Sequence, residues 1–232
     1  MPFFKNNFKQ LLHLLFPAEC FGCAQPLIPE ESDICNTCLQ ALPYTDHHLH
    51  PENLVARQFW GRLPCSAAMA MLFFKKGNVT RQLIHHLKYS NQPSLGLKLG
   101  TLLGERLLTA PLYQNIDFLV PVPLHPKRSA ERGYNQSECI ARGIAQVLKV
   151  PISTRHLFRK TVTDTQTNKG RLLRFDNMST AFELQHLKEL ENTHLLLIDD
   201  VLTTGATMEA CGITLLQSMP EKLSIAALAF VK

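Results

Sequence analysis

Leu195-Leu-Leu-Ile-Asp-Asp-Val-Leu-Thr-Thr-Gly-Ala-Thr207 joins a short apolar run, two carboxylates and a loop of small residues. An unbroken apolar run is typical of a central parallel strand that is buried on both faces, so residues 195–198 are predicted as a strand ending in solvent at the acids. Apolar residues at helical spacing follow from Met208 to Gln217. A strand, a tight loop and a helix in this order predict an α/β fold with a largely parallel sheet and flanking helices, whose ligand lies at the carboxyl edge of the sheet.

The loop combines hydroxyl groups, small side chains and one flexible glycine: Thr203, Thr204, Gly205, Ala206 and Thr207. A helix N-terminus directly after such a loop binds phosphate through its unpaired backbone N–H groups and its positive dipole end. Asp199 and Asp200 would repel a phosphate, so they require hydroxyl donors or a cation on the same ligand. A ribose 5-phosphate meets both demands. Two alternatives are the magnesium-binding strand of a P-loop ATPase, although the chain has no Gly-x-x-x-x-Gly-Lys-Ser/Thr segment, and a structural turn capped by threonines.

The same stretch resembles the phosphoribosyl pyrophosphate signature of type I phosphoribosyltransferases, and its surroundings resemble the ComF family of competence proteins. Further matching segments cover nearly the whole chain: Ile84, Lys88 and Tyr89, Val120-Pro-Val-Pro-Leu124, Arg132-Gly-Tyr-Asn-Gln136, Thr165-Gln166, Arg171, Asn177 and Phe182. The resemblance implies a type I phosphoribosyltransferase-like domain in which Asp199 and Asp200, the candidate catalytic residues, hold the ribose hydroxyls. It also implies that the loop from Thr203 to Thr207 wraps the 5-phosphate.

Basic residues after a second predicted strand, Asp117 to Pro123, are candidates for neutralising a diphosphate. Lys127 and Arg128 lie in the segment from His125 to Arg132, and the resemblance places the pyrophosphate loop at residues 124–128. The resemblance also adds Lys88 and Arg171 as candidate ligand-binding residues, with magnesium accompanying the phosphoribosyl pyrophosphate. A solvated basic loop and a solvated helix face are the alternatives for these positions.

The stretch from Arg155 to Arg174 carries six basic residues and one acid, Asp164, and its middle is polar. Such a stretch has little apolar surface to bury. It is interpreted as a mobile loop that closes over a polyanion and excludes water from a reactive sugar. The alternative is a basic loop without a ligand.

Four of the seven cysteines form two C-x-x-C pairs separated by eleven residues: Cys20, Cys23, Cys35 and Cys38. Two such turns can direct four thiolates at one ion, and a closed four-thiolate site predicts structural zinc. Gly22 is expected to allow the backbone conformation of the first turn. A redox C-x-x-C pair is the alternative. The total of seven cysteines is odd, and four of them form two close pairs, which suits metal binding in a reducing cytoplasm better than a framework of disulfides.

Two modules are predicted. Residues 1–64 contain an N-terminal helix from Phe3 to Phe16, the zinc module and a linker from Pro43 to Pro64, and residues 65–232 form the phosphoribosyltransferase-like domain. Trp60 is expected to pack the first module against the second. Whether the linker histidines have a metal role is left open: His47, His48 and His50.

Further elements are predicted from apolar periodicity, prolines and capping residues. The expected strands and helices are Ala67–Phe74, Asn78–Ser90, Leu95–Leu108, a helix capped by Asn135 and running through Lys149, a strand or hairpin arm over Ile152–Lys160, and a last strand over Leu223–Val231.

The composition is that of an ordinary globular protein, with 232 residues, 45% hydrophobic and 19% charged. A net charge of +5 favours anionic partners without separating phosphorylated metabolites from nucleic acid. No run of 18 apolar residues occurs, so no membrane span is expected. A cytoplasmic location is predicted from the grouped cysteines and from the N-terminal apolar segment, which has no small-residue cleavage site before Pro17.

The resulting functional prediction is a ComF-like protein that binds phosphoribosyl pyrophosphate and single-stranded DNA and acts in DNA uptake and natural transformation, with other DNA-uptake proteins as candidate partners. The alternative is an active phosphoribosyltransferase that transfers ribose 5-phosphate to a nucleobase or another acceptor and releases pyrophosphate. Catalysis is left open, because no segment of the sequence identifies an acceptor site.

Overall fold

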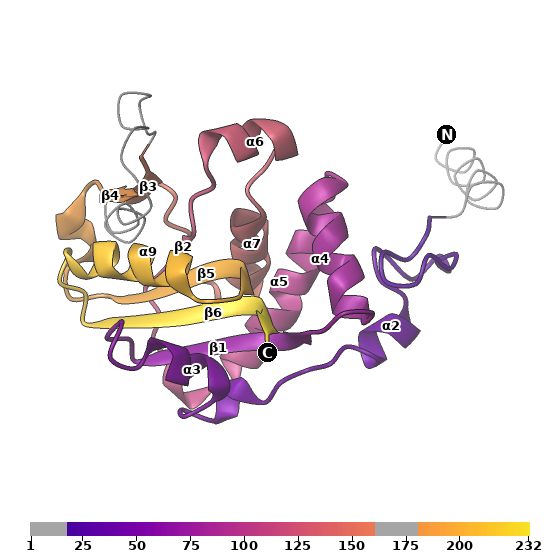
Figure 1. Ribbon diagram of the computed structural model, residues 1–232, viewed down its shortest axis with the longest axis horizontal. Helices are drawn as coiled ribbons and strands as arrows, with labels where there is room; N and C mark the ends of the chain where they lie inside the picture. The colour runs from indigo at the N-terminus through magenta and orange to yellow at the C-terminus, as the bar shows by residue number, and fades with distance from the viewer. Residues whose placement is uncertain (1–17, 161–180) are drawn as a thin grey trace, which may run out of the picture.

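A parallel sheet of four strands forms the centre of the computed structural model, which describes residues 18–160 and 181–232 (Figure 1). The strands lie in the order β1-β6-β5-β2, and each neighbouring pair is parallel. Their bounds are Ala67–Phe74 for β1, Phe118–Pro121 for β2, His194–Leu202 for β5 and Lys222–Val231 for β6. The predicted α/β class with a largely parallel sheet is therefore confirmed.

Helices and a short hairpin surround the sheet. The helices are α2 (Asn36–Gln40), α3 (Leu54–Phe59), α4 (Val79–Tyr89), α5 (Pro93–Leu108), α6 (Pro126–Arg132), α7 (Gln136–Leu148) and α9 (Ala206–Leu216). Short 3-10 turns cover His47–Leu49, Pro111–Tyr113 and Leu187–Leu190, and the antiparallel pair consists of β3 (Leu157–Arg159) and β4 (Phe182–Leu184). Within the described part of the chain, no helix combines the length and apolar character that crossing a membrane requires.

Alternating residues of the strands feed two apolar layers. On β5, Leu196 and Ile198 join the core cluster that contains residues of α4, α5 and α7, together with three of the paired cysteines. Leu195 and Leu197 join a second cluster that contains residues of α3, α9 and the β3–β4 hairpin. Because β5 is buried on both faces, its apolar run does not alternate with polar residues. The sheet is thus the middle of three layers (Figure 1).

The backbones of α5 and α7 touch. A Cβ atom added at Gly100 would lie 2.2 Å from the carbonyl oxygen of Ile140, and one added at Gly143 would lie 2.2 Å from that of Leu97. No side chain fits at either position, so two glycines are required for this approach. The contact fixes α7, whose N-terminal end reaches the carboxyl edge of the sheet.

Several predicted elements match the structure closely. The strand over Ala67–Phe74 has the predicted bounds, and α4 is capped by Asn78, whose side chain accepts from the N–H of Arg81. Asn135 caps α7 as predicted. The prediction that a strand ends in solvent at Asp199 was wrong: β5 continues through both acids to Leu202, and Asp200 is buried.

The segment predicted as a linker, Pro43 to Pro64, carries α3 and packs into the core. Val55 and Phe59 are fully buried against the second apolar cluster, because they lie four residues apart on one helix face. Trp60 is 59% exposed, so the expectation that it packs the first module against the second was wrong. The division at residue 64 stays a prediction. The predicted helix over residues 3–16 lies outside the described residues, as do positions 161–174 of the predicted mobile loop.

Candidate functional site

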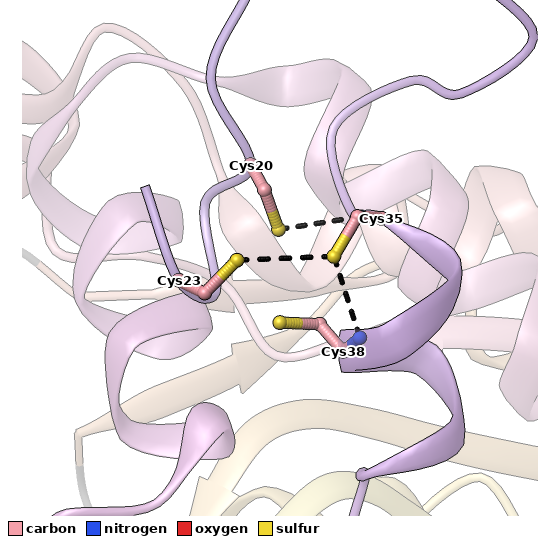
Figure 2. Close-up of side chains that lie close together, drawn as sticks. All are labelled: Cys20, Cys23, Cys35 and Cys38. Atoms are coloured by element: carbon pink, nitrogen blue, oxygen red, sulfur yellow. Dashed lines mark hydrogen bonds between the residues drawn. The ribbon is translucent and has the colours of Figure 1, made fainter. Parts of the chain in front are cut away.

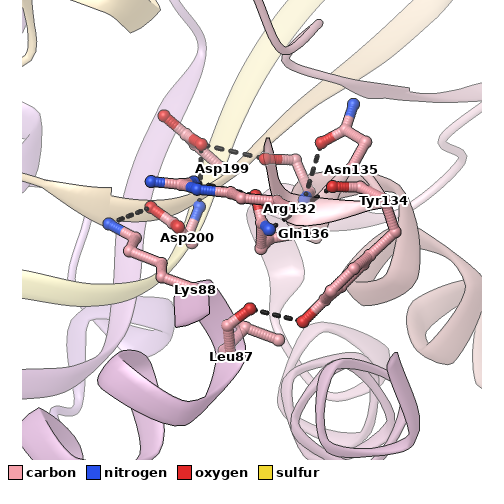
Figure 3. Close-up of polar contacts among 9 residues, drawn as sticks. Leu87, Lys88, Arg132, Tyr134, Asn135, Gln136, Asp199 and Asp200 are labelled. Atoms are coloured by element: carbon pink, nitrogen blue, oxygen red, sulfur yellow. Dashed lines mark hydrogen bonds and ion pairs between the residues drawn. The ribbon is translucent and has the colours of Figure 1, made fainter. Parts of the chain in front are cut away.

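Asp199 and Asp200 lie near the carboxyl end of β5, close to the end of α4 and the beginning of α7 (Figure 3). Oδ1 of Asp199 accepts hydrogen bonds from Oγ of Ser137 and from the backbone N–H of Asp200, both at 2.9 Å. Oδ1 of Asp200 lies 3.1 Å from Nζ of Lys88. The structure therefore brings Lys88, one of the predicted ligand-binding residues, to the carboxylate pair.

The environment of this pair changes the acidity of Asp199. Burial raises the pKa of its carboxyl to about 7, and the neighbouring Asp200 carboxylate adds to the rise. The Asp200 N–H, the Ser137 hydroxyl and the Lys88 ammonium favour the ionised form and lower the pKa in part. A divalent cation or a ligand hydroxyl placed beside Asp199 would favour ionisation further. The pair is therefore suited to hydroxyl donors and cations, as the sequence predicts.

The loop 203–207 connects β5 to α9 and lines a cavity of about 40 Å³. Gly205 is the N-cap of α9 and has a φ of +75°, a conformation that favours glycine. The first N–H groups of the eleven-residue helix have no partners within the helix, and its positive dipole end faces the loop. Thr203 and Thr207 also line the larger pocket that contains the two carboxylates. A phosphate in the loop and a sugar on the carboxylates would thus lie side by side.

Helix α3 and the turn that follows it hold this loop from outside, a role that was not predicted from the sequence. Nε2 of Gln58 donates to the carbonyl oxygen of Thr203 at 3.1 Å, and Nη1 of Arg62 donates to that of Thr204 at 3.2 Å. Arg62 also forms an ion pair with Glu209 in the first turn of α9. The loop is therefore tied both to α3 and, through Arg62, to its own helix.

Phe59 completes the support of the loop. A Cβ atom at Gly205 would lie 3.2 Å from two ring carbons of Phe59, a tight contact that adds to the preference of this backbone conformation for glycine. A signal for α3 was present in the sequence: Asn53 can cap a helix, and Val55 and Phe59 follow at helical spacing. The surrounding prolines and histidines obscured it.

A pocket of about 230 Å³ connects the carboxylate pair with cationic side chains. The cations that line it are Lys88, Arg128, Arg132 and Arg159. Lys88 and Arg128 are predicted ligand-binding residues, and Arg132 and Arg159 belong to the two basic segments that are predicted to meet the ligand's negative charge. Lys127 lies in α6, but the structure describes only its backbone. Arg171 lies outside the described residues. Four positive side chains facing two acids suit a ligand that carries both hydroxyl and phosphate groups.

The segment before α7 shapes one wall of the pocket. Nη1 of Arg132 donates to Oε1 of the buried Gln136 at 3.0 Å, and the hydroxyl of Tyr134 donates to the carbonyl oxygen of Leu87 (Figure 3). Asn135 caps α7 and also donates to the carbonyl oxygen of Val122 at 3.1 Å, just beyond β2. These bonds connect α4, α7 and the end of β2, the elements that bring Lys88 to Asp200 and Ser137 to Asp199.

The four paired cysteines form one cluster next to α4 (Figure 2). Their sulfur atoms all lie within 4.8 Å of one another, and those of Cys23 and Cys35 are 3.8 Å apart. A Cβ atom at Gly22 would lie 2.8 Å from Sγ of Cys38, and the backbone of Gly22 is not in the left-handed region. Space rather than backbone conformation therefore requires this glycine. Burial and the neighbouring thiols raise the pKa of Cys38, a cost that a bound cation would offset. The cluster could hold a metal ion.

Relatives of the chain are found among curated proteins and solved structures. No protein-family model matches it. It is 30% identical over 217 residues to DNA utilization protein YhgH of Escherichia coli strain K12, covering 88% of this chain and 93% of that protein. It is 29% identical over 151 residues to competence protein F of Haemophilus influenzae, covering 63% and 66%. A glutamine phosphoribosylpyrophosphate amidotransferase from B. subtilis, complexed with ADP and GMP, is similar in structure at 15% identity and a TM-score of 0.40. That match covers 65% of this chain and about a quarter, 26%, of the amidotransferase.

The predicted fold class is confirmed by the parallel sheet, by the strand, loop and helix from β5 to α9, and by the clustered cysteines. The class is an α/β domain with a parallel sheet and flanking helices, next to a cluster of four cysteines.

Proposed function

The chain belongs to the ComF family of competence proteins, and on that premise we propose that it binds phosphoribosyl pyrophosphate and single-stranded DNA in the cytoplasm, as part of DNA uptake and natural transformation. The relatives bear names that refer to DNA utilization and to competence. The observation that carries the proposal is the carboxylate pair beside the loop 203–207, in a pocket lined by four cations. Phosphoribosyl pyrophosphate presents a 5-phosphate, two ribose hydroxyls and a diphosphate, which match these three groups of side chains.

Each group has one role in the proposed complex. The loop 203–207 and the first turn of α9 bind the 5-phosphate through backbone N–H groups. Asp199 and Asp200 accept hydrogen bonds from the ribose hydroxyls. Four cations that line the same pocket neutralise the diphosphate: Lys88, Arg128, Arg132 and Arg159. Lys127 and Arg171 are proposed to join them on the basis of the family resemblance.

Magnesium is proposed to bind together with the diphosphate. Magnesium takes oxygen ligands and is usually held by one or two carboxylates plus substrate phosphates. Asp199 and Asp200 offer such oxygens, and the raised pKa of Asp199 would fall in the presence of a divalent cation. The donor set therefore fits the ion, which would neutralise part of the charge of the bound diphosphate.

Zinc is proposed for the four cysteines. A zinc–thiolate bond of about 2.3 Å in a tetrahedral site gives a sulfur–sulfur spacing of about 3.8 Å. The sulfurs of Cys23 and Cys35 have that spacing, and all four sulfurs lie within 4.8 Å of one another. Four protein ligands leave no open coordination position, so the proposed role of zinc is structural.

The affinity of the pocket for its ligand tests the first half of the proposal. Asp199→Asn combined with Asp200→Asn keeps the shape of the side chains but removes the charged acceptors. Binding of phosphoribosyl pyrophosphate, measured by calorimetry with magnesium, should weaken at least about tenfold, because charged hydrogen bonds contribute roughly 1.5–3 kcal/mol each. Unchanged affinity in a folded double variant would place the ligand elsewhere.

The coupling between the two ligands tests the proposed DNA binding. It also distinguishes a ligand-responsive DNA-binding protein from the alternative, an active transferase. If the protein is a ligand-responsive DNA-binding protein, phosphoribosyl pyrophosphate changes its affinity for single-stranded DNA, and DNA changes the affinity for the sugar by the same factor. A transferase instead releases pyrophosphate in proportion to an added acceptor. We expect reciprocal coupling and no pyrophosphate release with free nucleobases. Turnover with any one base would establish the transferase.

A further inference from the structure

Three ring side chains line the outward face of α4. The rings of His85 and Tyr89 are 5.1 Å apart between centroids, and those of His85 and His86 are 6.0 Å apart. Tyr89 is the last residue of the helix, and it is 68% exposed although its side chain is a large aromatic ring. A single exposed tyrosine is ordinary on a protein surface, so its neighbours determine whether it has a function.

The row of rings continues at both ends. Toward the four-cysteine module, the ring of Phe21 lies 5.0 Å from that of His86, and Phe21 is inside the first cysteine pair. Toward the pocket, the guanidinium carbon of Arg132 lies 5.6 Å from the centre of the Tyr89 ring. Five planar groups therefore form a continuous series from the cysteine module to the carboxylate pocket.

A second pocket of about 460 Å³ opens beside Tyr89. Its lining residues are Lys88, Tyr89, Asn91, Arg128, Glu131 and Arg132. Three of them, Lys88, Arg128 and Arg132, also line the pocket with the carboxylates, so the two pockets adjoin. The pocket thus holds one exposed aromatic ring, three cations, an amide and a single acid, Glu131. An aromatic ring beside an excess of cations suits a nucleotide, because the ring stacks on a base and the cations contact phosphates.

We propose that Tyr89 is a stacking platform for a nucleobase of a single nucleic acid strand, with His85 as the next ring and with Arg128 and Arg132 on the strand's phosphates. This inference rests on the proposed function and deepens it, because it names the surface that the strand occupies. A duplex does not fit the same surface, since its bases are stacked inside and offer no free face to a protein ring. The strand would lead from the cysteine module to the mouth of the sugar-diphosphate pocket.

Tyr89→Ala tests the platform, with Tyr89→Phe as the conservative variant and Trp60→Ala as the matched control. Trp60 is 59% exposed, and the guanidinium carbon of Arg57 lies 5.9 Å from the centre of its ring, so it resembles Tyr89 in exposure and in its cationic neighbour. It caps the C-terminal end of α3 and lines neither of the two pockets beside Tyr89. Binding of a fluorescent oligothymidylate of about 12 nucleotides is measured by anisotropy at about 0.15 M salt. We expect Tyr89→Ala to weaken binding about fivefold to tenfold, and Tyr89→Phe and Trp60→Ala to leave it near that of the wild type.

Two further measurements separate stacking from charge. The dependence of affinity on salt should keep its slope in Tyr89→Ala, because a ring releases no counterions, and should flatten in Arg128→Gln. An abasic strand of equal length should bind the wild type and Tyr89→Ala equally well. If Tyr89→Ala and Trp60→Ala bind alike, or if the abasic strand still distinguishes Tyr89→Ala from the wild type, the platform is overturned.

Other outcomes identify what has failed. If the wild type binds phosphoribosyl pyrophosphate but no strand at this salt concentration, the DNA half of the proposed function fails together with the platform. If the wild type binds the strand and Tyr89→Ala does so equally well, only the platform fails. If free thymidine displaces the strand at concentrations near that of the strand, Tyr89 holds a small base ligand and the proposed strand site is wrong.

Discussion

The side-chain amide of Gln58 donates a hydrogen bond of 3.1 Å to the carbonyl oxygen of Thr203, across 145 positions of sequence. Through this bond and its neighbour from Arg62, a short helix that the sequence analysis placed in a linker sets the position of the candidate phosphate loop. The consequences can be tested one residue at a time.

Gln58→Ala should weaken the binding of ribose 5-phosphate about fivefold while the free energy of unfolding changes by less than about 1 kcal/mol. The stability change is small because the substitution also removes a buried acceptor, Oε1 of Gln58, that has no partner in the described part of the chain. Calorimetry and urea unfolding measure the two effects. Gln217→Ala, at the far end of α9, is the control and should change neither. A large loss of stability without a loss of affinity would contradict a positioning role.

Gly205→Ala should destabilise the protein by more than Gly61→Ala does. Both glycines have a similar positive φ, +75° and +71°, so both variants carry the same backbone cost of about 1 kcal/mol or more. A Cβ atom at Gly61 would meet nothing within 4 Å, whereas at Gly205 it would press on the ring of Phe59. The difference between the two melting temperatures isolates that contact, and only Gly205→Ala should weaken phosphate binding. Equal effects of the two substitutions would show that Phe59 does not support the loop.

The wild type should lose stability as pH rises, because Asp199 must give up its proton, and Asp199→Asn should not show this loss. The unfolded carboxyl titrates near pH 3.9, and the folded one has a pKa of about 7, so the folded state holds the proton more tightly. Its contribution is fully present below the unfolded pKa and is lost as pH rises through about 7. At about pH 8, Asp199→Asn should therefore be more stable than the wild type by on the order of 2 kcal/mol. Urea unfolding over this pH range measures the effect, and the exposed Asp46→Asn should reproduce the wild-type profile.

Lys88→Gln should move the midpoint of that pH dependence upward, because the ammonium of Lys88 lowers the pKa of Asp199 in the wild type. It should also cost about 2 kcal/mol near neutral pH, since Asp200 loses a partner while it stays buried. Lys76→Gln, an exposed position before α4, removes the same charge from the protein without touching the pair. If the midpoint moved upward equally in Lys76→Gln and Lys88→Gln, the cause would be a general charge effect and not the contact with Asp200.

Cys35→Ser should release the proposed metal and loosen the cysteine module. The purified wild type should contain about one zinc ion per chain by atomic absorption, because two C-x-x-C turns hold one tetrahedral ion. Cys65→Ser changes a cysteine outside the cluster and should keep the zinc. Intact disulfides among the four clustered cysteines in material kept under reducing conditions would contradict the metal site.

The parts of the fold that local sequence signals specify were predictable. β1 is a run of apolar residues, and α4 and α7 each begin at an asparagine that caps them, so their positions followed from residues within one turn. The order of strand, loop and helix at Asp199 also depends on neighbours in the chain. The prediction placed these residues correctly but ended β5 too early, because charges usually mark the end of a buried strand and here Lys88 compensates one of them.

Partners that are distant in the sequence were not predictable. Ser137 lies 62 positions before Asp199, and no feature of its neighbourhood indicates that its hydroxyl donates to that carboxylate. Helix α3 has only six residues, so its cap and one pair of apolar residues at helical spacing make a weak signal, and its stability depends on burying Val55 and Phe59. Such contacts arise from tertiary packing, on which a single sequence carries little information.

The glycine contact between α5 and α7 bears on any attempt to redesign this pocket. Ser137 lies six residues from Gly143, about 9 Å along the same helix, so the position of its hydroxyl depends on a place where neither backbone can move aside. An engineer who wishes to admit a different sugar or a longer phosphate chain should therefore leave α7 alone. New specificity can be built on α6 instead, because α6 lines the pocket through the side chains of Arg128 and Arg132, and side chains can be exchanged without shifting a helix.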